Sequence, residues 1–220
     1  MKIIDPHLHL FDLKKGQYPW LKPESEPKWP DKHVIRKDFS EQDLFVDHVG
    51  LQNKRLDLCG FVHIEAGFDN EKPWREVDWL EKAVVNNFKT IASTNLLLAP
   101  DMFKKQIEEL KRYSSVVGVR HILDDNAKVI LSSDNCLDNL SFLESQGLIF
   151  ELQANIADPL IVDSIIESLS ALSYGNLTVG INHAGFPPLE PNLSQYELAN
   201  WLSGIEQLSA FSNVLIKCSG

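Results

Sequence analysis

The chain has 220 residues and an ordinary globular composition, 44% hydrophobic and 24% charged, which supplies enough apolar side chains for one sizeable core. Its formal net charge is −10 and it contains no basic stripe, which argues against a nucleic acid as a partner. No apolar run approaches the roughly 18 residues that a membrane-spanning helix requires, so we expect no membrane partner either.

The chain begins with a short β-rich run, Lys2–Ile4, and two histidines follow it one residue apart in the stretch DPHLH. Residues two apart on a β-strand point to the same face, so a strand that ends near Leu10 aims the imidazoles of His7 and His9 at one point. Two converging imidazoles can bind a divalent metal or an anionic substrate. Two unrelated surface histidines are an equally good interpretation of this motif alone.

Residues 14–38 form a long segment that carries four of the chain's 11 prolines and includes Trp20 and Trp29. The segment follows the carboxyl end of the first predicted strand, the end at which barrel enzymes build their sites. Loops of this length in compact domains are usually functional or disordered. We therefore expect residues 14–38 to cover the mouth of the site, and a loop packed on the flank of the barrel is the alternative.

Six further β-rich runs follow, and most are nearly continuous apolar stretches, as expected for parallel strands buried on both faces. These predicted strands are Leu58–Glu65, Thr90–Leu98, Val116–Leu123, Leu148–Ala154, Leu177–His183 and Val214–Ser219. Strands that alternate with helices indicate βα units and a parallel sheet. Seven strands, counting the first, favour a (β/α) barrel over an open sheet.

Amphipathic stretches with helix start and stop signals lie between the predicted strands. The signals are N-caps at Asp101, at Asp158 before Pro159 and at Ser194 with Glu197, and stops at Gly147 and Gly175. The phosphate-binding signatures GxGxxG and GxxxxGK[ST] are absent, so we expect no nucleotide cofactor.

Polar side chains gather where the predicted strands end, which is where a parallel barrel builds its active site. In chain order they are His7 and His9, His63 and Glu65, Asn95, Arg120 and His121, Glu151 and Gln153, Asn182 and His183, and Lys217. Five of the seven histidines fall at these positions, which scattered histidines would rarely do. Arg120 and His121 are adjacent on one strand, so only one of them can enter the barrel mouth.

The segments DPHLHLFD, YPWL, FVHIEAG, GVRHIL, FELQ, INHAGFP and NVLIKCSG, in this order, resemble the amidohydrolase superfamily. More narrowly, they resemble the amidohydrolase-related TIM-barrel hydrolases, which include sugar-lactone and pyrone-dicarboxylate lactonases. The resemblance covers essentially the whole chain and implies one α/β domain over residues 1–220, a TIM-like (β/α) barrel. It implies an enzyme that hydrolyses small sugar-derived or carboxylated lactones by attack of water on the carbonyl.

The resemblance also implies roles for particular residues. The expected catalytic residues are His7, His9 and His183, which are also the expected ligands of a divalent metal such as zinc, and the expected substrate-binding residues are Arg120, Glu151 and His63. Arginine suits a carboxylate because its planar fork pairs with both oxygens. Two of these assignments have alternatives: Glu151 is equally well an interior polar residue, and His63 is more often a core histidine than a ligand.

The sequence departs from the family pattern at its end. Such enzymes carry an aspartate at the end of the eighth strand in a GSDWP-like segment, whereas this chain stops at Ser219-Gly220, directly after the seventh predicted strand. We therefore expect an incomplete barrel with about seven of eight strands. We also expect the 220-residue chain alone to have negligible lactonase activity, and to form a homo-oligomer through its open barrel edges or to be poorly stable.

Two other functions stay open at this point: a metal-dependent decarboxylase of the same superfamily, and a non-catalytic remnant barrel. The family does not settle whether a metal is required. The cysteines, Cys59, Cys136 and Cys218, lie far apart without CxxC spacing, so we expect buried reduced thiols in a cytoplasmic protein. The expected partner is a small-molecule substrate.

Overall fold

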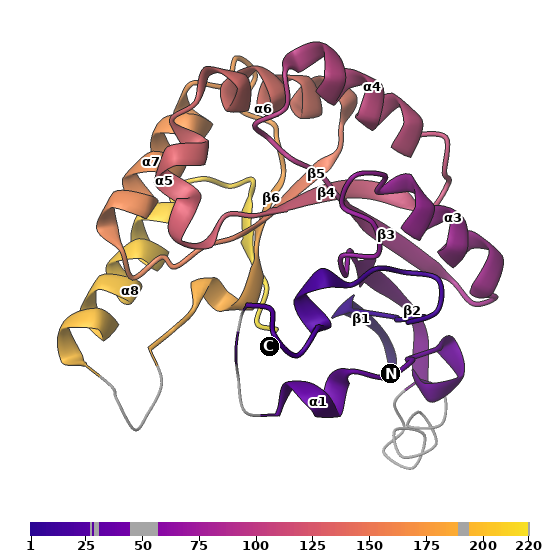
Figure 1. The fold of residues 1–220 in the computed structure, drawn as a ribbon. Coiled ribbons are helices and arrows are strands. Elements are labelled where there is room, and N and C mark those ends of the chain that lie inside the picture. The colour runs from indigo at the N-terminus through magenta and orange to yellow at the C-terminus, as the bar shows by residue number, and fades with distance from the viewer. Residues whose placement is uncertain (27, 29–30, 45–56, 189–193, 220) are drawn as a thin grey trace. The chain divides into compact units, whose positions relative to one another are not determined.

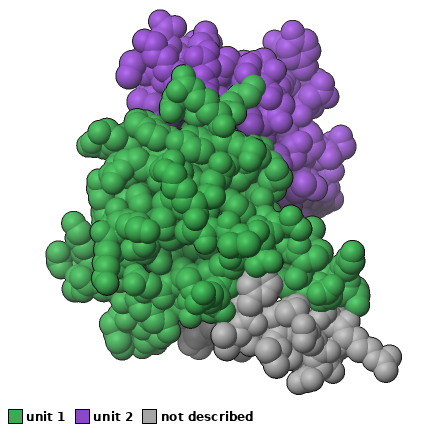
Figure 2. All heavy atoms as spheres, turned by 90° about the vertical axis from the view of Figure 1, so that its right-hand side faces the viewer, with its two compact units in different colours: residues 1–94, 109–117 green, residues 95–108, 118–220 purple. Residues whose placement is uncertain are grey.

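The computed structural model describes residues 1–26, 28, 31–44, 57–188 and 194–219 (Figure 1). Trp29 of the predicted site-covering loop lies outside these ranges. The chain divides into two compact units (Figure 2): unit 1 consists of residues 1–94 and 109–117, and unit 2 of residues 95–108 and 118–220. The expectation of one domain over the whole chain therefore stays a prediction.

Seven strands form the sheet, and they follow one another in it in sequence order. They are β1 (Lys2–Leu8), β2 (Asp57–Ile64), β3 (Phe88–Ser93), β4 (Val116–Ile122), β5 (Ile149–Gln153), β6 (Val179–Ile181) and β7 (Val214–Ile216). The pairs β1–β2, β2–β3, β4–β5, β5–β6 and β6–β7 are parallel. Sequential parallel strands with helices between them define the predicted class, an incomplete TIM-like (β/α) barrel with seven strands in the described part of the chain, and the fold prediction is confirmed.

The helices between the strands begin and end largely where the sequence signals lie. They are η1 (Pro19–Leu21), α1 (Lys32–Ile35), α3 (Trp74–Ala83), α4 (Pro100–Leu110), η2 (Asp124–Asn126), α5 (Ala127–Leu131), α6 (Asp134–Gln146), α7 (Pro159–Ser170), η3 (Asn182–Gly185) and α8 (Gln195–Leu208). Asp158 caps α7 by accepting from the N–H of Leu160 at 2.9 Å. Ser194 caps α8 from its Oγ, and Gly147 ends α6 with φ 66°.

Two helix signals were wrong. Helix α4 begins at Pro100, because the carbonyl of Ala99 already accepts from the N–H groups of the residues three and four positions on, so Asp101 lies inside the first turn. Its carboxylate there complements the positive end of the helix rather than capping it. Helix α7 ends at Ser170, so Gly175 does not end it. Gly175 lies instead in the segment before β6, with φ 62°.

Several strand ends differ from the sequence expectation: β6 and β7 end at Ile181 and Ile216, so His183 and Lys217 lie just beyond them. Strand β1 continues from Ile4 to Leu8 with register irregularities on the way, so His7 belongs to the strand. Strand β3 ends at Ser93, and Asn95 lies beyond it, where its side chain accepts from the N–H of Leu97 at 2.9 Å. An asparagine that bonds the backbone two residues on forms a turn, which competes with strand extension.

In unit 2 the sheet presents an apolar and a polar face. Phe150 and Leu152 on β5 are buried, as are Val179 and Ile181 on β6, while α6 and α7 run along the outer side of these strands (Figure 1). Side chains alternate along a strand, so Glu151, between the two apolar residues of β5, points to the opposite face. That face carries the polar residues of the candidate site.

The cysteines correct one expectation. Cys136 is buried in α6, whereas Cys59 and Cys218 are exposed. Cys59 is the third residue of β2, where exposed and buried residues alternate, and Cys218 follows the end of β7. Within the part of the chain that the structure describes, no helix is both long and apolar enough to cross a membrane.

Candidate active site

His7 and His9 lie together at the carboxyl end of β1 in unit 1. The centroids of the two imidazole rings are 5.2 Å apart in an edge-to-face arrangement, so the side chains converge as their spacing predicts. The backbone N–H of His7 donates to the carboxylate of Asp5 at 2.9 Å, which supports the irregular backbone at this point of the strand. The pair is therefore a local feature of unit 1.

The main chain of the neighbouring strand holds the ring of His9 in one tautomer. Its Nδ1 lies 2.8 Å from the carbonyl oxygen of Ile64, the last residue of β2. A carbonyl can only accept, so Nδ1 carries the hydrogen, and Nε2 of the neutral ring carries the lone pair. Histidines that bind a metal through Nε2 are usually held in this way.

His63 is fully buried behind this pair, and the protein engages both of its ring nitrogens. Nδ1 accepts from the N–H of Leu10 at 3.2 Å, and Nε2 donates to the carboxylate of Glu76 at 3.0 Å. Glu76 is itself buried in α3 and also accepts from the N–H of Ala66 at 2.9 Å. These contacts favour the interpretation of His63 as a core residue, which fixes the course of the chain as it leaves β1, over a contact to substrate.

The predicted site-covering segment, residues 14–38, is attached to the loop that follows β2, residues 66–68. The N–H groups of Gln17 and Tyr18 donate to carbonyls of this loop at 2.7 and 3.0 Å, and the indole of Trp20 donates to a third at 2.7 Å. Tyr18 is buried in an aromatic cluster, and burial raises the pKa of its phenol. The segment thus lies against the carboxyl end of β2, and its role as a cover stays a prediction.

Four polar side chains at the ends of β4 to β7 form one hydrogen-bonded network in unit 2. Asn182 donates from Nδ2 to Glu151 at 2.7 Å and accepts at Oδ1 from Arg120 at 3.3 Å. The ammonium of Lys217 lies 2.8 and 3.0 Å from the two oxygens of Glu151. Arg120, Glu151 and Asn182 are buried, while the side chain of Lys217 is 14% exposed. Two predicted substrate-binding residues are thereby brought together.

Arg120 and His121 point to opposite faces of β4. Arg120 pairs in register with Glu151 and lies on the face of the network, whereas His121 pairs with the buried apolar Leu152. Nδ1 of His121 accepts from the N–H of Leu96 at 3.3 Å. Arg120 is therefore the residue of this pair that can meet a ligand on the polar face.

His183 lies in a left-handed turn directly after β6. His183, Ala184 and Phe186 have φ of 52°, 50° and 58°, a region that costs about 1–2 kcal/mol for each residue with a Cβ. The N–H of Ala184 donates to the carbonyl of Lys217 at 2.8 Å, and the carbonyl of Ala184 accepts from the indole of Trp201 at 2.8 Å. Backbone strain of this kind persists where surrounding contacts over-determine it, and it clusters at functional sites.

The ring of His183 is held like that of His9. Its Nδ1 lies 3.1 Å from the carbonyl oxygen of Ser219, beyond the end of β7, so its Nδ1 also carries the hydrogen and its Nε2 the lone pair of the neutral form. The ring packs against Phe186 with centroids 5.7 Å apart. Each unit therefore carries one predicted catalytic histidine whose tautomer is set by a backbone carbonyl.

Asp124 is a candidate that the sequence interpretation missed. It follows β4 with φ 41°, and its carboxylate accepts from Gln153 at 3.1 Å. Burial raises the pKa of Asp124, and the neighbouring Asp125 adds to this effect, while the hydrogen bond from Gln153 and the positive charge of Arg120 oppose it. A predicted substrate-binding residue, Arg120, thus acts on the pKa of Asp124. In the sequence it is one of two adjacent aspartates before a helix, which carries no signal beyond a cap.

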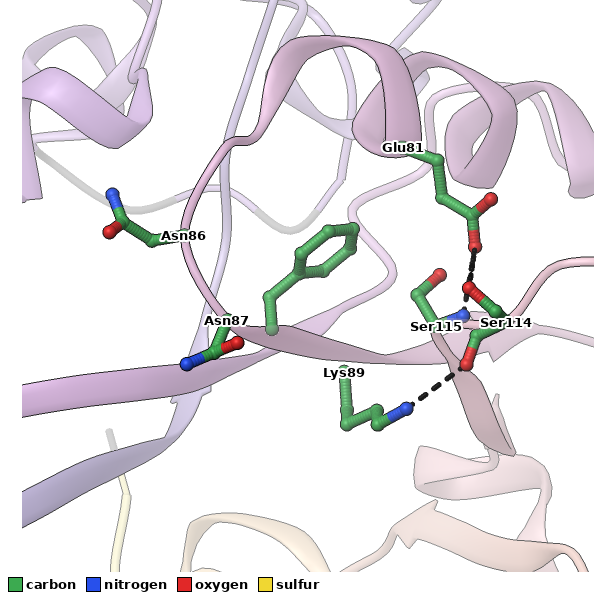
Figure 3. Close-up of a pocket in the computed structure, with 7 residues that line it drawn as sticks. Glu81, Asn86, Asn87, Lys89, Ser114 and Ser115 are labelled. Atoms are coloured by element: carbon green, nitrogen blue, oxygen red, sulfur yellow. Dashed lines mark hydrogen bonds between the residues drawn. The ribbon is translucent and has the colours of Figure 1, made fainter.

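A cleft of about 260 Å³ lies at the other end of the strands in unit 1 (Figure 3). It is lined by Glu81, Asn86, Asn87, Phe88, Lys89, Ser114 and Ser115, at the start of β3 and just before β4. Lys89 donates to the carbonyl of Ser114 at 3.0 Å, and Glu81 accepts from the N–H of Ser115 at 2.8 Å. Parallel barrels build their sites at the carboxyl ends of the strands, so this cleft is not assigned to the active site.

The predicted metal ligands are divided between the units, His7 and His9 in unit 1 and His183 in unit 2. Among the residues whose placement is described, no three His, Cys, Asp or Glu side chains are grouped so as to hold a metal ion. The lone pairs on Nε2 of His9 and His183 nevertheless fit the neutral nitrogen donors that zinc prefers. The three-histidine metal site therefore stays a prediction.

Sequence comparison finds a relative of this chain whose function is not described. No family model matches the chain. An uncharacterized protein of Sinorhizobium fredii is 27% identical over 230 residues, which cover 99% of this chain and 72% of that protein. Its description adds no function.

Solved structures of amidohydrolases share the fold. Amidohydrolase 2 from Bifidobacterium longum subsp. infantis matches with a TM-score of 0.71 and 17% identity, over 100% of this chain and 74% of its own. A zinc-bound amidohydrolase from Burkholderia multivorans matches with a TM-score of 0.72 and 17% identity, over 99% of this chain and 69% of its own. A probable 2-pyrone-4,6-dicarboxylic acid hydrolase from Acinetobacter baumannii, with citric acid bound, matches with a TM-score of 0.62 and 19% identity, over 100% of this chain and 71% of its own. The structural neighbours are thus the proteins that the sequence resembles, and the chain has their fold.

Proposed function

We propose that this protein is a hydrolase that opens small lactones, sugar-derived or carboxylated, by attack of water on the ring carbonyl. The observation that carries the proposal is that His9 and His183, which follow strands β1 and β6, both have Nδ1 bonded to a backbone carbonyl. In its neutral form, a ring held in this way offers Nε2 as a base. The names of the structural neighbours, a pyrone-dicarboxylic acid hydrolase among them, support the choice of a cyclic ester.

In the proposed reaction, water attacks the lactone carbonyl and gives up a proton to Nε2 of a site histidine. The ring C–O bond then breaks, and the leaving alkoxide takes a proton to yield the hydroxy acid. His183 suits the role of base because its strained turn and its bond to the carbonyl of Ser219 fix the direction of Nε2. Arg120 is proposed to bind the substrate carboxylate or hydroxyls, since it is held by Asn182 on the polar face of unit 2.

A metal-assisted form of the reaction is the alternative, in which His7, His9 and His183 would hold a divalent metal such as zinc. In that form the lone pair on Nε2 of His183 would be donated to the metal, so His183 would act as a ligand and not as the base. When bound, the metal would polarise the lactone carbonyl and lower the pKa of bound water. The zinc-bound amidohydrolase among the structural neighbours supports this proposal. Metal analysis of the purified protein, with and without added zinc, tests it.

Hydrolysis of a lactone panel tests the function. The purified protein is assayed for acid release from 1,4- and 1,5-sugar lactones and from carboxylated lactones, alongside the variant His183→Ala. The panel is run on the 220-residue chain and on a form extended by an eighth strand that ends in aspartate. We expect negligible turnover by the 220-residue chain alone, turnover of at least one lactone by the extended form, and loss of that turnover when His183→Ala is introduced into it. No release above the buffer rate by the extended form for any lactone would contradict the proposal and favour a non-catalytic barrel.

A further inference from the structure

Glu151 lies at the centre of the polar network of unit 2. Its two carboxylate oxygens accept from Lys217 at 2.8 and 3.0 Å, and one of them also accepts from Asn182 at 2.7 Å. The amide of Asn182 is thereby oriented with its nitrogen toward Glu151 and its oxygen toward Arg120, which donates to it at 3.3 Å. The contacts form a chain that runs from the lysine through the glutamate and the asparagine to the arginine.

Gly180 allows Glu151 to reach Lys217 across β6. Glu151 pairs in register with Gly180, and Gly180 pairs with Leu215 of β7, two residues before Lys217. A Cβ at position 180 would lie 3.0 Å from Cγ and 3.5 Å from the carboxyl carbon of Glu151. A glycine inside a strand packs poorly and usually marks a close approach, which here is the side chain of Glu151 lying over it.

The charges of Glu151 and Lys217 have opposite effects on the electrostatic potential at Arg120. A buried carboxylate in contact with the group that orients Arg120 reduces the positive potential that an arginine offers to an anion. Lys217 contacts both oxygens of that carboxylate and offsets its charge. Lys217 therefore reduces the negative charge that Glu151 places near Arg120. A buried lysine–glutamate pair is weak grounds for stability, since apolar replacements of similar volume are often as stable or more so.

We propose that Glu151 is a positioning residue for Arg120, acting through Asn182, and that Lys217 offsets the charge of Glu151 so that this carboxylate does not weaken the attraction of Arg120 for a carboxylate ligand. The inference rests on the proposed role of Arg120 in substrate binding. It assigns Lys217 a part in carboxylate binding that requires no contact between Lys217 and the ligand. Gly180 provides the space in which this pair forms.

Citrate binding tests the assignment without any turnover. Isothermal calorimetry at low ionic strength measures the dissociation constant of citrate for the wild type and for Arg120→Ala, Lys217→Met, Glu151→Gln and the double variant Lys217→Met/Glu151→Gln. Lys82→Met is the matched control, since it removes a lysine that pairs with a carboxylate, Asp78, on an exposed helix face. Circular dichroism confirms that each variant is folded at the temperature used.

The expected pattern is a loss of affinity followed by rescue. Arg120→Ala and Lys217→Met weaken citrate binding at least tenfold, and Lys82→Met changes it less than twofold. The double variant returns to within threefold of the wild type, because removal of the carboxylate removes the charge that Lys217 offset. A double variant as weak as Lys217→Met would overturn the inference in favour of direct contact by the lysine.

Two other results would also overturn the inference. Unchanged affinity in Lys217→Met would make the pair purely structural, and a wild type that binds citrate no better than Arg120→Ala would remove Arg120 from the site. Failure of the proposed function is distinct from all of these, because a protein that hydrolyses no lactone can still give the pattern of loss and rescue.

Discussion

The two units hold their histidines by different means. In unit 1, His9 follows the irregular end of β1 and is supported by packing: His63 and Glu76 are buried behind it, and an aromatic cluster lies beside it. In unit 2, His183 lies in a left-handed turn beside a network of charged and amide groups. Substitutions behind the site of unit 1 should therefore mainly lower stability, and substitutions in unit 2 should mainly lower binding or turnover.

The largest expected effect on turnover comes from His183. Replacement by alanine removes the proposed base, and a positioned acid–base group contributes about 100-fold to 10,000-fold. We expect kcat/KM of the extended form for the best lactone to fall at least about 100-fold, with little change in the midpoint of thermal unfolding. His33→Ala, at an exposed position in α1, is the control. A decrease in kcat/KM of less than tenfold would contradict the role of His183 as the base.

The largest expected effect on stability comes from Glu76 in unit 1. Glu76→Ala leaves Nε2 of His63 and the N–H of Ala66 buried without their acceptor, which should cost about 3 kcal/mol of unfolding free energy. Urea unfolding measures the loss, and Glu71→Ala on the exposed loop is the matched control. Equal unfolding midpoints for the two variants would contradict the conclusion that the buried contacts of Glu76 and His63 support unit 1.

Arg120 should have a smaller effect on turnover than His183. Arg120→Ala removes one charge-assisted contact to substrate, so we expect kcat/KM to fall about tenfold, mainly through KM. His121→Ala is the comparison because it alters the opposite face of the same strand. A change under about threefold in Arg120→Ala, well below 1 kcal/mol, would contradict its role in substrate binding.

The smallest expected effects are on pH dependence, and they have opposite signs in the two units. Burial acts to raise the pKa of Asp69, but hydrogen bonds from Arg75 and from the N–H groups of Lys72 and Glu71 outweigh it and hold the pKa below its ordinary 3.8. The stability that ionised Asp69 contributes is present above about pH 4 and is lost as the pH falls through its lowered pKa. Asp69→Asn should thus cost about 1 kcal/mol at pH 7 and much less near pH 2.

Asp124 in unit 2 should behave in the reverse way. Burial raises its pKa, so the ionised carboxylate lowers stability above that pKa, and the penalty disappears once the pH is below its ordinary 3.8. Asp124→Asn should stabilise the protein at pH 7 by less than about 1 kcal/mol, since the group is partly solvated. Urea unfolding of both variants at pH 7 and pH 3 measures the signs, and destabilisation by Asp124→Asn at pH 7 would contradict this assignment.

The strand order and most helix ends followed from periodicity and capping residues, because these signals are local in the sequence. The convergence of His7 and His9 followed from the same alternation. The polar network could not be predicted in this way. Glu151 reaches Lys217 by lying across Gly180, and a contact between separate strands leaves no local signal in the sequence. The left-handed turn at His183 was also missed, because positive φ is uncommon even for histidine, and alanine gives no sequence signal for it.

The carbonyl oxygens of Ile64 and Ser219, which set the tautomers of the two site histidines, belong to the main chain. No codon change at these positions removes them, so an alanine scan would pass over both residues even if catalysis depended on them. Diverging relatives could rewrite both side chains while each imidazole kept its proton on Nδ1. The acceptors are encoded by the path of the backbone, and only a change in that path, or an amide-to-ester replacement in the chain, would reveal their contribution.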